Sequence, residues 1–188
     1  MTEAVEQLFQ TGEEKMEKAI SQLKREFGTV RTGRANPTIL DKVLVDYYGA
    51  PTPLRQLSQV TVQDGTTLVI SPFDKSILKD VEKAIIKAEL GIAPNSDGIC
   101  LRLAFPPLTE DRRKEIVKDV KKMGEDAKIA IRNIRRDMTD GIKKLEKSEN
   151  LPEDTVKDYQ DRIQKITDKY TKIIDSNVSE KEKEVMTV

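Results

Sequence analysis

The sequence contains 188 residues, with 33 basic side chains, 33 acidic side chains and no histidine. The lack of histidine excludes histidine-based catalytic triads and removes the commonest metal ligand. The zero net charge argues against a generic polyanion binder, so that any nucleic-acid contact must come from a local patch. Aromatic residues make up only 4% of the chain, which suits long solvated helices better than a thick globular core.

The first predicted element is a long amphipathic helix from about Thr2 to Thr29. Its apolar residues recur every three or four positions, the spacing of the buried face of a packed helix. This apolar face consists of Phe9, Gly12, Met16, Ala19, Leu23, Phe27 and Val30. Glycine is a poor helix former, so Gly12 weakens the prediction locally.

The segment 31–105 loses the helical period and becomes rich in Val, Thr and Tyr, interrupted by Gly and Pro, which indicates short strands. A hairpin is expected at Asp64-Gly65, and a helix is expected to end at Gly91. The inward face of that helix should carry Val81, Ala84, Ile85 and Ala88. The strands are expected near residues 43–48, 58–62, 66–71 and 99–105.

Two further amphipathic helices fill the last third of the chain. The first begins near Thr109, a hydroxyl cap followed by acidic residues, and the second begins near Pro152, which suits a first helical position. Three such helices can bury their apolar faces only against each other. The sequence therefore predicts an α+β fold: an elongated antiparallel three-helix bundle of residues 1–30 and 106–188, with an inserted small α+β domain at 31–105.

The chain crosses between the two predicted domains twice, at "RTGRANP" (31–37) and "AFPPLT" (104–109). Glycine can adopt almost any backbone conformation, and consecutive prolines are stiff and end both strands and helices. We interpret Thr32 and Gly33, together with Pro106 and Pro107, as a two-strand hinge. An ordinary rigid corner is the alternative.

Motifs of enzymes and of cofactor or metal sites are missing from the sequence, including the phosphate loop and the Gly-x-Ser-x-Gly elbow. The single cysteine, Cys100, cannot form an internal disulfide and is expected to be buried packing within a strand. No apolar run reaches the ~20 residues of a membrane span, and the acidic N-terminus resembles neither a signal nor a transit peptide. We expect a cytoplasmic protein without membrane contact, monomeric, and without a cofactor or metal.

Basic residues crowd one face of the helix that contains "AIRNIRRDMTDGIKK" (130–144). Neither Arg132 nor Arg135 has an acidic neighbour on its own helix, so we expect both to be exposed without carboxylate partners. On the last helix, by contrast, acid-then-base pairs four residues apart are frequent, such as Asp158 with Arg162. Arginine suits bidentate bonds to phosphate, and the helical projection predicts an extended RNA-binding ridge. Its members are Lys121, Lys128, Arg132, Arg135 and Arg136.

Two other interpretations of this ridge are possible. The arginines could pair across the bundle with acidic residues of another helix. A membrane surface or a calmodulin-like partner is less suitable, because the apolar stripe of the helix is needed inside the bundle and its polar face offers no aromatic anchor.

The sequence resembles the ribosome recycling factor family over essentially its whole length. The resemblance rests on the order of elements and on "RTGRANP", "YYGAPTPLRQL", "PPLTEDRRKE", "IRNIRRD" and "KEKEVM". It implies a three-helix bundle and a smaller β/α/β domain joined by a flexible hinge in an L shape. It also implies binding to the large subunit of the post-termination ribosome and, with elongation factor G and its GTP, splitting of the subunits so that mRNA and tRNA leave.

The resemblance also implies roles for particular residues. It places the critical rRNA-binding arginines at Arg132 and Arg135, and it places Arg31, Gly33 and Arg34 at the hinge end of the bundle. The factor itself is not an enzyme, because the GTPase is the partner. Two alternatives remain from other classes: a helical chaperone or adaptor, and a general RNA-binding module.

Overall fold

The computed structural model describes residues 2–187, and these fold into two compact units. The first unit comprises Met1–Arg31 with Glu110–Val188, and the second comprises Thr32–Thr109. The sequence placed the end of the inserted segment at residue 105. The second unit instead extends to Thr109, because residues 105–109 are irregular and the next helix begins only at Glu110.

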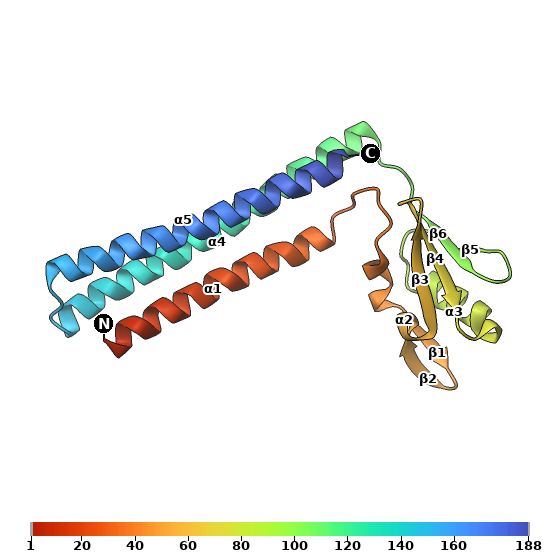
Figure 1. Cartoon of the computed structure of the whole chain (residues 1–188), viewed down its shortest axis with the longest axis horizontal. Coiled ribbons are helices and arrows are strands. Elements are labelled where there is room, and N and C mark those ends of the chain that lie inside the picture. Colours follow the sequence, from red (N-terminus) through yellow and green to blue (C-terminus); the bar gives the residue numbers. More distant parts are fainter. Residues whose placement is uncertain (1, 188) are drawn as a thin grey trace. The chain divides into compact units, whose positions relative to one another are not determined.

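The first unit is a bundle of three helices, α1 (Glu3–Gly28), α4 (Glu110–Ser148) and α5 (Glu153–Met186). Figure 1 shows that α4 and α5 run side by side and that α1 lies along them. The Thr2 side chain accepts a hydrogen bond from the Val5 amide, which caps the start of α1. Pro152 occupies the N-cap of α5, one position earlier than the sequence suggested.

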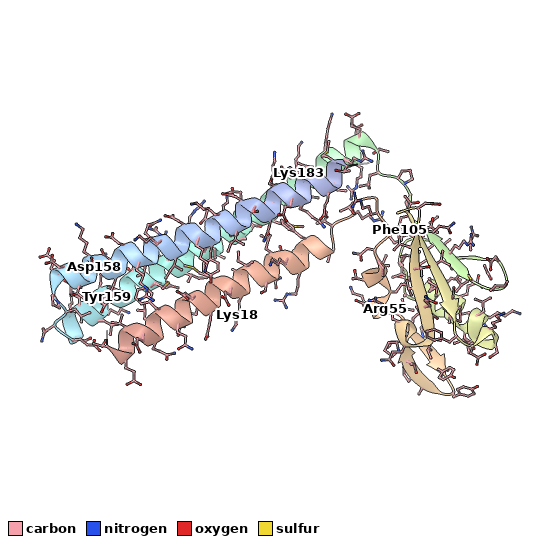
Figure 2. The ribbon with its side chains drawn as sticks, in the orientation of Figure 1. Lys18, Arg55, Phe105, Asp158, Tyr159 and Lys183 are labelled. Carbon is pink, nitrogen blue, oxygen red and sulfur yellow. The ribbon has the colours of Figure 1, made fainter. Side chains whose placement is uncertain are left out.

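The predicted apolar stripes face the interior of this bundle. On α1 the buried side chains recur at helical spacing, with Ile20 rather than the neighbouring Ala19 fully inside. Tyr159 of α5, labelled in Figure 2, meets Phe9 of α1 edge to face, with ring centroids 6.0 Å apart. The core of the bundle comprises Val5, Phe9, Met16, Ile20, Leu23, Phe27, Ile116, Val120, Ile131, Met138, Ile142, Val156, Ile163, Tyr170, Ile174 and Val185.

Glycines allow the helices of the bundle to approach closely. Gly12, which weakened the helix prediction, is buried in α1, and a Cβ there would overlap the flexible Met138 side chain of α4. Met138 borders a groove of about 430 Å³ between α1 and α4. At Gly124 of α4 a Cβ would lie 2.5 Å from a methyl group of Val178. Valine has one stiff rotatable bond, so glycine is required more strictly at 124 than at 12.

The second unit contains a four-stranded antiparallel sheet in the order β3-β4-β6-β5 and a separate hairpin, β1-β2. The helix α3 (Leu78–Lys87) buries Val81 and Ile85 in its core, as predicted. One side of the sheet packs into this core through Leu68, Ile70, Leu101 and Leu103. The strands are β1 (Leu44–Tyr47), β2 (Ala50–Pro53), β3 (Ser58–Gln63), β4 (Thr67–Pro72), β5 (Asn95–Ser96) and β6 (Leu101–Ala104); the short helices are η1 (Pro37–Lys42), α2 (Leu54–Leu57) and η2 (Lys75–Ile77).

The β1–β2 and β3–β4 hairpins of this unit turn through residues with positive φ. The β3–β4 hairpin confirms the expected signal, with φ of 54° at Asp64 and 70° at Gly65. The β1–β2 hairpin was not predicted as a pair, because the two prolines of β2 are unusual in a strand. Its two-residue loop consists of Tyr48 and Gly49, with φ of 50° and 82°, the signs of a type I′ turn.

Candidate RNA-binding site

The basic residues predicted to bind RNA lie along the middle of α4. Lys121, Arg132 and Arg136 are exposed, whereas Arg135 and Lys128 are partly buried. Fifteen residues separate Lys121 from Arg136, which at 1.5 Å per residue extends about 22 Å along the helix. The face is therefore long enough to follow several phosphates of a nucleic-acid backbone.

Lys128 makes interactions within the bundle itself. Its ammonium group pairs with Asp175 of α5, and it also lies 3.6 Å from Glu125 of α4. The hydrogen bond to Asp175 raises the pKa of Lys128, and its side chain is only 20% exposed. Lys128 thus joins α4 to α5, as the alternative of pairing across the bundle predicted. It is therefore not counted among the cations that face RNA.

Arg132 corrects a second expectation from the sequence. Its guanidinium lies 4.0 Å from Glu125, so Arg132 does have an acidic neighbour on its own helix. The expectation considered only residues three and four positions away, whereas Glu125 lies two turns away on the same face. The two side chains are 57% and 60% exposed, and an ion pair this open and this long contributes little to stability.

Arg135 lacks a carboxylate partner among the described residues, as expected, but it is partly buried rather than exposed, because its side chain lies against α5. It donates a hydrogen bond of 3.3 Å to the side-chain oxygen of Gln164, and Gln164 in turn donates one of 2.9 Å to Asp168. A neutral amide orients the arginine without cancelling its charge. The sequence could not show this contact, because Gln164 is 29 residues away on another helix.

We call Lys121, Arg132, Arg135 and Arg136 the arginine ridge. Within residues 2–187, Lys121 and Arg136 have no ion-pair or hydrogen-bond partner, and the other two have weak or neutral partners. Exposed guanidinium groups with free N–H donors can bind phosphate oxygens in pairs. The ridge can therefore bind a phosphate backbone at little cost to internal contacts.

The remaining predicted residues lie on the two crossings between the units. Arg31 and Arg34 are exposed, in the irregular segment that follows α1. Gly33 has a φ of 79°, a conformation that favours glycine, and its nearest neighbour on the other crossing is the Leu108 side chain. Thr32 is partly buried, and Pro106 and Pro107 are exposed and belong to no helix or strand.

Other features bear on the function classes raised by the sequence. Cys100 lies just before β6 and is partly buried rather than fully packed, with its sulfur 3.3 Å from the Ser71 hydroxyl. In the part of the chain that the structure describes, no three histidine, cysteine or carboxylate side chains gather as a metal site would require. No helix within residues 2–187 combines the length and apolar character needed to cross a membrane.

Comparison with known proteins gives one consistent answer. The family profile described as "Ribosome recycling factor" matches residues 23–186. The chain belongs to the ribosome recycling factor family. A ribosome-recycling factor of Geobacillus sp. (strain WCH70) is 53% identical over 184 residues, covering 98% of this chain and 100% of that protein. The ribosome-recycling factor of Bacillus subtilis (strain 168) is 56% identical over 93% of this chain and 95% of its own length.

Solved structures of the family share the fold. A solution structure of the ribosome recycling factor covers the whole of both chains with a TM-score of 0.80 and 36% identity. A second structure describes the T. thermophilus ribosome recycling factor and E. coli elongation factor G bound to the E. coli post-termination complex. It matches with a TM-score of 0.64 and 41% identity over the whole of both chains. The family resemblance and the α+β fold predicted from the sequence are both confirmed.

Proposed function

We propose that this chain recycles ribosomes in the cytoplasm: it binds the post-termination ribosome and, with elongation factor G and GTP, splits the subunits to release mRNA and tRNA. Family membership over nearly the whole chain carries this conclusion. A family member described on the post-termination complex together with elongation factor G supports the choice of partners.

We further propose that the arginine ridge contacts rRNA of the large subunit. Arg132 and Arg135 are the central members, because both guanidinium groups are accessible and neither is tied to a short ion pair. Lys121 and Arg136 extend the same charged surface along α4, and Arg31 and Arg34 add exposed cations on the first crossing. Contacts of this kind position a factor on RNA without reading its sequence.

In this proposal the chain acts as a non-catalytic factor. Hydrolysis of GTP belongs to elongation factor G, and this chain contributes shape and charge. It should therefore hydrolyse no GTP alone.

The test is a subunit-splitting assay with purified post-termination ribosomes, followed by light scattering and by breakdown of polysomes. Splitting should require the chain, elongation factor G and GTP together, and omission of any one should abolish it. Splitting without elongation factor G, or equal binding to naked rRNA and to intact ribosomes, would favour a general RNA-binding module. Retention of an unfolded client protein would favour the chaperone alternative.

The two crossings are proposed to act as a hinge, and Gly33 allows a matched test. A β-branched side chain at φ 79° is strained, so Gly33→Val should destabilise the chain by roughly 1–3 kcal/mol. Gly98→Val imposes the same kind of strain at φ 87°, in an open turn before β6. Both variants should lose similar thermal stability, while only Gly33→Val slows subunit splitting. Equal rates for the two variants would contradict the hinge.

A further inference from the structure

The β1–β2 hairpin presents an aromatic side chain at its tip. Tyr48 is 86% exposed, the most exposed of the large apolar or aromatic side chains in the described chain. It occupies the first position of the two-residue loop between Tyr47 and Ala50. Neither the arginine ridge nor the crossings explain this residue.

The backbone at Tyr48 makes its presence unexpected. A two-residue loop with positive φ at both positions favours Asn-Gly or Asp-Gly, and a bulky aromatic residue rarely adopts φ near 50°. The β3–β4 hairpin of the same unit has a longer, three-residue loop, and its two positive-φ positions carry the residues usual there, Asp64 and Gly65. Tyr48 therefore occupies a position where local folding favours another residue, a common sign of a functional requirement.

The ring of Tyr48 packs against the ring of its neighbour. Its centroid lies 4.5 Å from that of Tyr47 at an interplanar angle of 75°, and Tyr47 packs against the core of the small unit. A tyrosine has only two side-chain torsions, and a ring that already has a packing partner loses less conformational entropy on binding than a long flexible side chain. Such tyrosines are frequent among the residues that dominate protein–protein binding energy.

The charge of the hairpin indicates which kind of surface it meets. Between Leu44 and Pro53 the only charged residue is Asp46. Arg55, the next cation along the chain, is paired with Asp41 at 2.8 Å, and Lys42 lies about 20 Å from the tip along an extended strand. An RNA surface carries dense phosphate charge and requires cations opposite it, which this tip lacks.

We propose that the tip formed by Tyr47 and Tyr48 is a docking point for elongation factor G. In this proposal the exposed ring of Tyr48 makes the apolar contact, and Asp46, the only charged residue of the hairpin, offers a carboxylate to a basic side chain of the partner. The proposal rests on the proposed function, in which elongation factor G is the protein partner and rRNA is contacted by α4. The exposed side chain of Leu44 and the prolines of β2 extend the apolar surface of the tip.

The decisive variant is Tyr48→Asn in the full chain, because asparagine suits the turn better than tyrosine. The variant should be at least as stable to heat as the parent chain. It should nevertheless need about tenfold more elongation factor G for half-maximal subunit splitting. Its binding to the large subunit without elongation factor G should be unchanged. Tyr48→Phe should remain within twofold of the parent, roughly the precision of such titrations.

Phe73→Asn provides a matched control, since Phe73 is another exposed aromatic residue of the same unit, at 72% exposure. It should leave the requirement for elongation factor G unchanged. Loss of thermal stability in Tyr48→Asn would show that the tyrosine is structural and overturn the proposal. So would an unchanged requirement for elongation factor G, or weaker ribosome binding in its absence.

Photo-cross-linking separates this proposal from the proposed function. With p-benzoylphenylalanine in place of Tyr48, the full chain is mixed with post-termination ribosomes, elongation factor G and a non-hydrolysable GTP analogue. A cross-link to elongation factor G supports the docking point even if the parent chain fails to split ribosomes, a result that would reject only the proposed function. A cross-link to rRNA or to a ribosomal protein, or no cross-link at all, overturns the docking point.

Discussion

Arg132→Ala and Arg135→Ala are each expected to weaken binding to the ribosomal large subunit roughly ten- to a hundredfold while leaving the fold intact. A hydrogen-bonded contact between a charged group and phosphate contributes roughly 1.5–3 kcal/mol, which sets this magnitude. Within the bundle each substitution removes only a weak interaction: an exposed ion pair at 4.0 Å for Arg132 and a neutral hydrogen bond at 3.3 Å for Arg135. Circular dichroism and thermal melts should therefore match the parent chain within about 0.5 kcal/mol.

Salt dependence gives the sharper measurement of the same contacts. Removing one phosphate contact should lower the slope of log affinity against log salt by about 0.7–0.9. Arg132→Lys should remain impaired, because lysine keeps the charge but cannot make the bidentate bond. Glu125→Gln removes the acid beside Arg132 and should strengthen binding. An exposed arginine of α1 serves as the control: Arg25→Ala should bind with the parent affinity.

Two outcomes would count against the arginine ridge. An unfolded alanine variant would show that the arginine holds the bundle together. A variant that folds and binds with the parent salt slope would show that rRNA contacts another face of the bundle.

Ile131→Ala is expected to have the largest effect on stability. Ile131 is completely buried in α4, within the core of the bundle, and removal of its side chain leaves a cavity. Such truncations cost roughly 2–5 kcal/mol, which for a chain of this size lowers the melting temperature by roughly 5–20 °C. Calorimetry or thermal circular dichroism of the purified variant measures this shift directly.

A neighbouring isoleucine on the same helix provides the matched control. Ile129 is 48% exposed, so Ile129→Ala should change stability by no more than about 0.5 kcal/mol. The two variants remove the same atoms, two residues apart. Equal melting temperatures would mean that α4 packs in solution through a different face.

Much of the fold follows from periodicity alone. The stripes around Phe9, Ile131 and Ile163 repeat with the period of a helix over many turns, and only mutual packing can bury them. Strand β2 could not be predicted, because two of its four residues are prolines and its pairing with β1 depends on an unusual turn. From the sequence alone Gly12 was expected only to weaken the predicted helix. The structure shows its role, because Met138 of α4 packs against it.

The sequence predicted that these cations lie on one helix, but not their contacts within the bundle. Residues Glu110–Ser148 do form one continuous helix, so the helical projection applies to them, and their role in binding RNA stays a prediction. Glu125 could have been predicted by considering neighbours two helical turns away as well as one. The partners Asp175 and Gln164 could not, because they depend on the rotation and axial register of α5 against α4, which no local pattern in one helix specifies.

The bundle consists of two stretches of chain separated by residues 32–109, and this affects the order of folding during synthesis. All residues of the small unit are available once Thr109 has emerged from the ribosome. The helix α1, by contrast, packs against α4 and α5, which are synthesised later. Domains fold as units as their chain becomes complete. The small unit is therefore native first, while the apolar stripe of α1 remains open to chaperones or to aggregation until α5, which begins at Glu153, has been made.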